Sequence, residues 1–252
     1  MKKFFVIAIM YCVNICVGQD NKLNLVDIID ALNVGTLHYL DSAPDKARSS
    51  ESMRQHFKDY ISAGYKDADY GNKPNKELIL SRNRQDFSLL EKNKIKIDSL
   101  LMNSTVMGSM LGEFHFSTRL PLRFADNSGK LTFLITGILS DKVYNTFSTT
   151  PKKRAISALQ DIILPYINRT SPIFSIKGLG FVAYQISYPC KDFTVKGGDY
   201  KRWECLAIVI PVELLKKFIK LKISEDELVA KSEIYLQDKS STELKKILIA
   251  LE

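Results

Sequence analysis

The sequence predicts an α+β fold: a mainly antiparallel sheet with helices packed on one face, preceded by a helical N-terminal segment. Apolar residues recur at helical spacing before about residue 105, whereas later segments alternate apolar and polar residues or stay apolar over strand lengths. Short turn-like stretches join these later segments, which favours antiparallel pairing. We therefore expect a signal peptide at 1–18, a helical region at 19–105 and an α+β sheet domain at 106–252.

The first eighteen residues have the three parts of a secretory signal peptide. Lys2 and Lys3 precede an apolar run from Phe4 to Val17, and Gly18 precedes polar residues. The run is shorter than the ~20 residues that a spanning helix needs. We expect removal on export to the periplasm or the extracellular space, with envelope association left open and no transmembrane segment in the mature chain.

Lipid anchoring is the alternative outcome of export, because two cysteines lie inside this leader. Tyr11 precedes Cys12 and Ile15 precedes Cys16, whereas a lipoprotein cysteine usually follows a small residue. The sequence therefore favours a soluble exported product.

The helical region is expected from three stretches with apolar residues on one stripe. They are Leu23–Val34, Arg48–Ala63 and Asp86–Met102, and Glu77–Ser81 is ambiguous between strand and helix. The residues 64–76 include glycines, a proline, asparagines and aspartates, which indicates a linker or long loop.

The sheet domain is expected to contain two hairpins, each followed by a helix. The first pairs Glu113–Phe124 with Lys130–Leu139, and the second pairs Phe181–Tyr188 with Trp203–Ile210. Helices are expected to begin at Pro151, where Thr150 is the cap, after Pro211, and at the capping box from Ser224 to Glu227. The first of these helices should bend or end before Pro165. The final strands are expected at Glu233–Leu236 and Lys246–Leu251. The repeated order leaves open a duplicated unit, although no residue pattern aligns the two halves.

Two cysteines remain after the leader, Cys190 and Cys205, one at each end of the second hairpin's polar loop. Antiparallel pairing brings loop ends close together, and an oxidising compartment permits a disulfide. We expect these two residues to be bonded; two free, buried thiols are the alternative.

The candidate catalytic residues are His115 and Glu113. On a strand they share a face with Ser117 and Arg119, so this polar row can supply an acid and a base. Alternation alone also predicts such a row as the solvent face of an edge strand. The sequence has no HExxH, CxxC, P-loop or GxSxG motif, so no metal or cofactor is expected.

The candidate binding residues are basic or aromatic. The formal net charge is +8 at pH 7, which suits a protein, glycan or other anionic partner, and nucleic acid is excluded by the expected export. Basic residues in the first turn of a helix oppose its dipole, and aromatic and arginine side chains dominate many interfaces. These two criteria select Lys152, Lys153 and Arg154 at a helix start, and Tyr200, Arg202 and Trp203 at the hairpin loop.

Two functional hypotheses follow. The favoured one is an exported binding or interaction module of a bacterial envelope that acts without catalysis. The alternative is an exported hydrolase that uses His115 with a nearby carboxylate. A binding module should have an exposed apolar or basic patch near the loop 191–204, whereas an enzyme should bring His115 and an acid together in a pocket. Solvated surface lysines and a core role for Trp203 are the structural alternatives for the binding residues.

Overall fold

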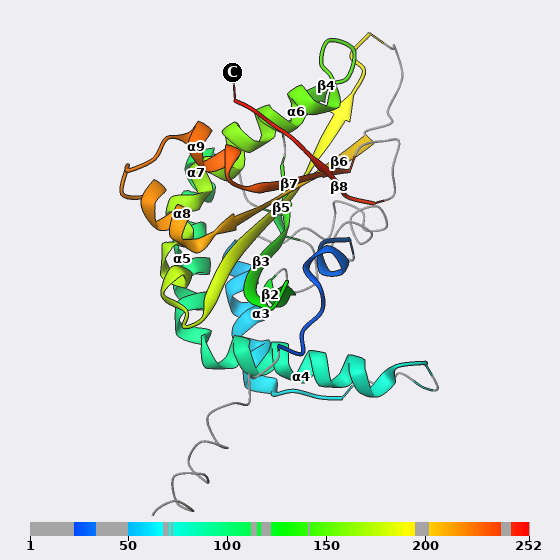
Figure 1. Cartoon of the computed structure of the whole chain (residues 1–252), viewed down its shortest axis with the longest axis vertical. Coiled ribbons are helices and arrows are strands. Elements are labelled where there is room, and N and C mark those ends of the chain that lie inside the picture. The colour runs from blue at the N-terminus through cyan, green and yellow to red at the C-terminus, as the bar shows by residue number, and fades with distance from the viewer. Residues whose placement is uncertain are drawn as a thin grey trace, which may run out of the picture.

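The computed structural model describes residues 23–33, 50–67, 71, 73–111, 115–116, 122–140, 142–194, 202–237 and 243–251. It confirms an α+β fold with a mostly antiparallel open sheet (Figure 1). The strands are β1 (His115–Phe116), β2 (Leu122–Asn127), β3 (Lys130–Leu139), β4 (Tyr144–Asn145), β5 (Leu179–Lys191), β6 (Arg202–Pro211), β7 (Glu233–Gln237) and β8 (Lys245–Ile247).

The sheet runs in the order β1-β3-β5-β6-β7-β8, with β2 also pairing β3 and β4 also pairing β5. The second predicted hairpin is present as β5–β6. The first is present as β2–β3, but β2 shares only Leu122–Phe124 with the expected strand Glu113–Phe124, of which residues 113–114 and 117–121 lie outside the described residues. In the first, Ser128 and Gly129 both have positive φ, as the tight two-residue turn of a hairpin requires. β3 and β5 are parallel because the helical segment 151–175 crosses over between them.

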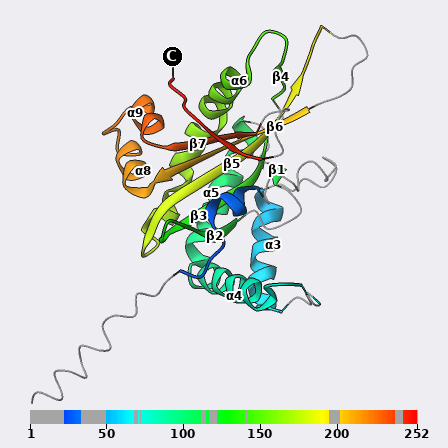
Figure 2. The same cartoon turned by 45° about the vertical axis from the view of Figure 1, so that its right-hand side comes forward.

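Most of the helices cover one face of the sheet, as the sequence predicted (Figure 2). A short helical turn at 28–33 covers the other face, where it packs on Leu134 and Ala183. The helices are α3 (Ser50–Ala63), α4 (Lys76–Lys92), α5 (Lys94–Leu111), α6 (Pro151–Ala158), α7 (Leu164–Ile167), α8 (Val212–Phe218) and α9 (Glu225–Ala230), with a π segment at Leu159–Ile163 and a 3-10 helix at Asn168–Ser175.

The helix boundaries follow the predicted capping residues. The Thr150 side chain accepts a hydrogen bond from the Lys153 backbone N–H at 3.3 Å, and Pro151 is the first helical residue. Ser224 caps α9 in the same way. The helix does not end before Pro165, because the π segment Leu159–Ile163 leads directly into α7.

The N-terminal helices and the sheet share one apolar core. Phe57, Leu90 and Ile97 of α3, α4 and α5 belong to the same buried cluster as Phe133 and Tyr184 of the sheet. The ambiguous stretch Glu77–Ser81 is part of α4, and the boundary expected between residues 105 and 106 falls within α5. In the part of the chain that the structure describes, no helix is both long enough and apolar enough to cross a membrane.

The predicted disulfide between Cys190 and Cys205 is wrong: both thiols are free and buried. The register of the hairpin pairs Cys190 with Arg202 and Ser187 with Cys205. Cys190 therefore lies three residues beyond Ser187, the partner of Cys205, and an odd offset puts the two side chains on opposite faces of the sheet. Cys190 belongs to the core under the helices, and Cys205 belongs to the core on the other face. Burial raises the pKa of each thiol to about 12, which keeps both of them protonated.

Candidate binding surface at the end of the sheet

The end of β5 and the turn after β4 form a projection at one end of the molecule, which we call the tip (Figure 1). β4 pairs with β5 in parallel through Tyr144 and Cys190 and through Asn145 and Lys191. The Thr146 backbone N–H also donates to the Lys191 carbonyl at 3.0 Å. These bonds hold the two chain segments side by side where they leave the sheet.

Each segment of the tip carries an exposed phenylalanine two residues beyond the paired Asn145 and Lys191. Phe147 is 70% exposed and Phe193 is 58% exposed. Isolated exposed apolar residues are common, but these two large rings lie on segments that are paired with each other at Asn145 and Lys191. The tip therefore offers apolar area that a partner can bury.

Side-chain hydrogen bonds order both turns of the tip. The Asn145 side chain accepts from the Phe147 backbone N–H, and Asp192 accepts from the Thr194 backbone N–H, each at 2.9 Å. The bonds from Thr194 also lower the pKa of the Asp192 carboxyl. Such turns hold the backbone on either side of each ring in one conformation before a partner binds.

Three lysines lie close in sequence to the two phenylalanines. Lys152 and Lys153 are exposed in the first turn of α6, which follows the turn containing Phe147. Lys191 at the end of β5 and the adjacent Asp192 are both half-buried. The tip thus combines two exposed aromatic rings with exposed lysines, and the binding hypothesis stays a prediction.

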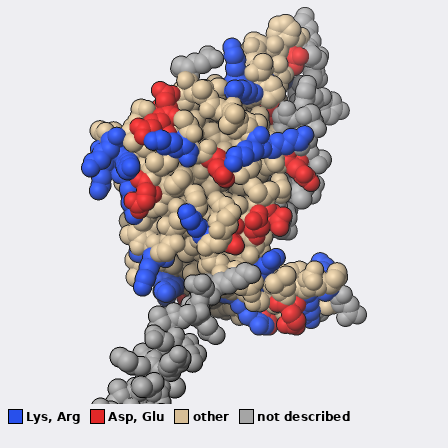
Figure 3. All heavy atoms as spheres, viewed as in Figure 1, with Lys and Arg blue, Asp and Glu red and all other residues tan. Residues whose placement is uncertain are grey.

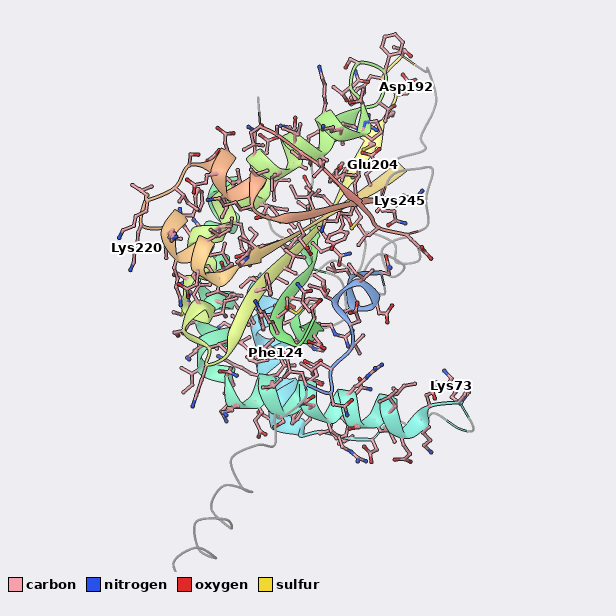
Figure 4. All side chains as sticks on the ribbon, in the orientation of Figure 1. Lys73, Phe124, Asp192, Glu204, Lys220 and Lys245 are labelled. Carbon is pink, nitrogen blue, oxygen red and sulfur yellow. The ribbon has the colours of Figure 1, made fainter. Side chains whose placement is uncertain are left out.

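Arg154 lies below the tip and is not available to a ligand, which corrects its assignment as a binding residue. Its guanidinium forms a bidentate ion pair with Glu204 of β6, with Nε–Oε2 at 2.9 Å and Nη2–Oε1 at 2.5 Å. Both side chains are 3% exposed. Figure 4 shows Asp192 at the tip and Glu204 deeper in the fold. The pair ties the first turn of α6 to the sheet.

The surroundings of this ion pair complete the support of the tip. Arg154 also donates to the Thr149 carbonyl, in the turn that carries Phe147. Burial alone would lower the pKa of Arg154, but the hydrogen bonds and the charge of Glu204 outweigh burial and raise it. Beside the Arg154–Glu204 pair, the rings of Tyr144 and Tyr188 pack edge to face, with their centroids 5.1 Å apart. The Tyr144 hydroxyl donates to Asp161 at 3.3 Å.

The remaining predicted residues are placed only in part. Trp203 is half-buried opposite Pro189, at the start of β6. Arg202 is described by its backbone alone, opposite Cys190, and Tyr200 lies outside the described residues. His115 pairs with Leu139 through its backbone, its side chain is not described, and Glu113 lies outside the described residues. The catalytic hypothesis therefore stays a prediction.

Phe147 and Phe193 were not among the residues predicted from the sequence. The available signal was an aromatic residue within a short polar stretch between predicted elements, as in Asn145–Thr150 and Lys191–Thr194. An aromatic residue in such a stretch stays exposed unless another segment of the chain folds over it.

No cluster of three His, Cys, Asp or Glu side chains that could hold a metal ion occurs among the described residues. Comparison with protein-family models, curated proteins and solved structures gave no match.

Proposed function

We propose that the protein is a binding module that uses the tip to contact an acidic protein surface, without catalysis. The observation that carries this proposal is the exposure of Phe147 and Phe193 on adjoining, hydrogen-bonded segments next to Lys152 and Lys153. Complete burial of a phenylalanine side chain contributes about 1.5–3 kcal/mol, so two rings can anchor a modest interface.

The lysines favour an acidic partner. Charges at the rim of an interface raise the association rate and select against partners of like charge. A protein surface suits the tip because it can provide both acidic groups and a pocket for two rings. Figure 3 shows acidic and basic residues interspersed over most of the visible face.

We further propose that the interaction takes place outside the cytoplasm, at the bacterial envelope or beyond it, because of the predicted signal peptide at 1–18. Intact-mass measurement of the product recovered from cell fractions tests this part. A secreted or periplasmic product that begins after Gly18 is expected. A full-length chain in the cytosol would contradict export while leaving the binding surface to be tested separately.

The binding test compares variants of the tip with a variant elsewhere. A partner is captured from envelope extract, purified and titrated against the wild type and against Phe147→Ser/Phe193→Ser. We expect the Kd to rise by roughly thirtyfold or more, since a lost aromatic anchor typically costs about 2 kcal/mol or more. Lys152→Gln/Lys153→Gln should mainly slow association and weaken its dependence on salt.

Leu221→Ser is the matched control, because Leu221 is 91% exposed and follows α8. Figure 4 places the adjacent Lys220 far from Asp192 at the tip. Unchanged binding by both tip variants, or an equal loss with Leu221→Ser, would show that the tip is not the contact surface.

A further inference from the structure

A groove between α3 and α5 has the composition of a small-molecule site, away from the tip. Its volume is about 300 Å³, at the lower end of the range for ligand pockets. Each helix contributes two adjacent residues and, one turn later, two more. The lining residues are Phe57, Lys58, Ile61 and Ser62 of α3, and Lys94, Ile95, Asp98 and Ser99 of α5.

The floor of the groove is apolar and its rim includes an unusually exposed apolar residue. Phe57 and Ile61 are 1% and 9% exposed, respectively, and they belong to the main core. Ile95, by contrast, is 78% exposed although it lines the same groove. A ligand with an apolar body can cover Ile95 and rest on the floor, which removes apolar surface from water.

Positive charge at the groove exceeds negative charge. The carboxylate of Asp98 is already engaged by Arg54, with oxygen–nitrogen distances of 2.7 and 3.0 Å, and this pairing lowers the pKa of Asp98. Lys58 lies 3.8 Å from the same carboxylate and is 45% exposed. The Lys94 side chain is exposed and has no hydrogen-bond or ion-pair partner among the residues that the structure describes. Arg54, Lys58 and Lys94 together outnumber the single carboxylate.

We infer that this groove binds a small amphipathic carboxylate, with its apolar chain on Phe57, Ile61 and Ile95 and its anionic group near Lys58 and Lys94. The serines at the groove add hydroxyl groups near the same rim, although Ser99 already donates to the Ile95 carbonyl at 2.9 Å. This inference does not rest on the proposed function, because no residue of the tip lines the groove.

Sodium octanoate is the probe, and the full chain is titrated calorimetrically with it. We expect saturable binding to one site, weaker binding of 1-octanol, which has the same chain without the charge, and no binding of octylammonium. Lys58→Gln/Lys94→Gln should weaken octanoate about tenfold, the size expected for charge-assisted hydrogen bonds, and leave 1-octanol unchanged. Ile95→Ser should weaken both.

Two controls make the result decisive. Lys216→Gln/Lys217→Gln removes the same number of charges from α8, and Phe147→Ser/Phe193→Ser alters the tip; neither should change octanoate binding. All the substituted groove residues are exposed or partly exposed, and an unchanged circular dichroism spectrum verifies folding. Absent saturation, equal affinity for 1-octanol, or equal weakening by the α8 variant would overturn the inference.

Discussion

The two faces of the sheet carry side chains of different size, although both are buried. Along β3 and β5, Phe133 and Tyr184 face the helices, whereas their neighbours Leu134 and Ala183 face the short turn at 28–33. On β6 the second face continues with Ala207 and Cys205. The difference follows from the cover: a layer of long helices leaves a wide gap that large rings fill, while one short helical turn lies close to the sheet.

The faces also differ in how they hold their cover. On the helix-covered face, Asp86 of α4 accepts a hydrogen bond from the Phe124 backbone N–H at 2.7 Å, and Glu204 pairs with Arg154 of α6. On the other face, Gln185 Nε2 donates to the Leu32 carbonyl at 2.8 Å. Charged groups therefore attach the helices, whereas a neutral amide attaches the turn at 28–33. Charged attachments make one face sensitive to substitution and to pH.

The largest expected effect on stability comes from cavities created at two adjacent positions of β3, one facing each side of the sheet. Phe133→Ala should lower the free energy of unfolding by about 4 kcal/mol, because long packed helices cannot close the space left by a ring. Leu134→Ala should cost about 2.5 kcal/mol, since less volume is lost and the short turn can move inward. Urea unfolding measures both values. An equal or larger loss for Leu134→Ala would contradict the proposed difference in packing.

Removal of one partner of the buried ion pair should have the next largest effect. Glu204→Gln leaves the Arg154 charge buried without a carboxylate, and we expect a loss of about 3 kcal/mol in the free energy of unfolding. The matched control is Glu213→Gln, which breaks the exposed pair with Lys216 and should cost less than about 1 kcal/mol. Similar losses in the two variants would show that the pair does not anchor α6.

The pH dependence of the Asp86 attachment should be the smallest of the three effects. Burial raises the pKa of Asp86 to about 6, although the Phe124 N–H and Arg123 partly offset the rise. Between about pH 4 and pH 6 the folded state therefore binds more protons than the unfolded state, so this group's contribution to stability falls as pH increases. We expect a fall of about 2 kcal/mol over that window.

Asp86→Asn removes this titration while it keeps an acceptor for the Phe124 N–H. The difference in unfolding free energy between wild type and Asp86→Asn should change across pH 4–6 and stay constant above pH 7. Asp98→Asn is the control, at a more exposed carboxylate with a lowered pKa. Its effect should stay nearly constant across pH 4–6 and change only below about pH 4, where the contribution of Asp98 is lost as pH falls. A pH-independent difference for Asp86→Asn would contradict the assignment.

Local features were predicted well because they depend on neighbouring residues. The alternation in Phe181–Tyr188, the Thr150 and Ser224 caps and the proline at the start of α6 each specify a backbone conformation within a few positions. The candidate site was predicted less well. Lys152 and Lys153 are exposed beside the tip, but Arg154 is buried, and the two phenylalanines were not selected.

The sequence by itself determined the α+β class, the second hairpin (β5–β6) and the start of each capped helix, because periodicity and capping act over one turn or one strand. The tertiary structure alone decided that Cys190 and Cys205 lie on opposite faces, since a shift of register by one residue reverses the face of every side chain. It also decided that Arg154 pairs with Glu204, 50 residues away, and that the segments carrying Phe147 and Phe193 pair through Asn145 and Lys191. Contacts between distant residues depend on how the layers pack, and no local pattern of residues records that packing.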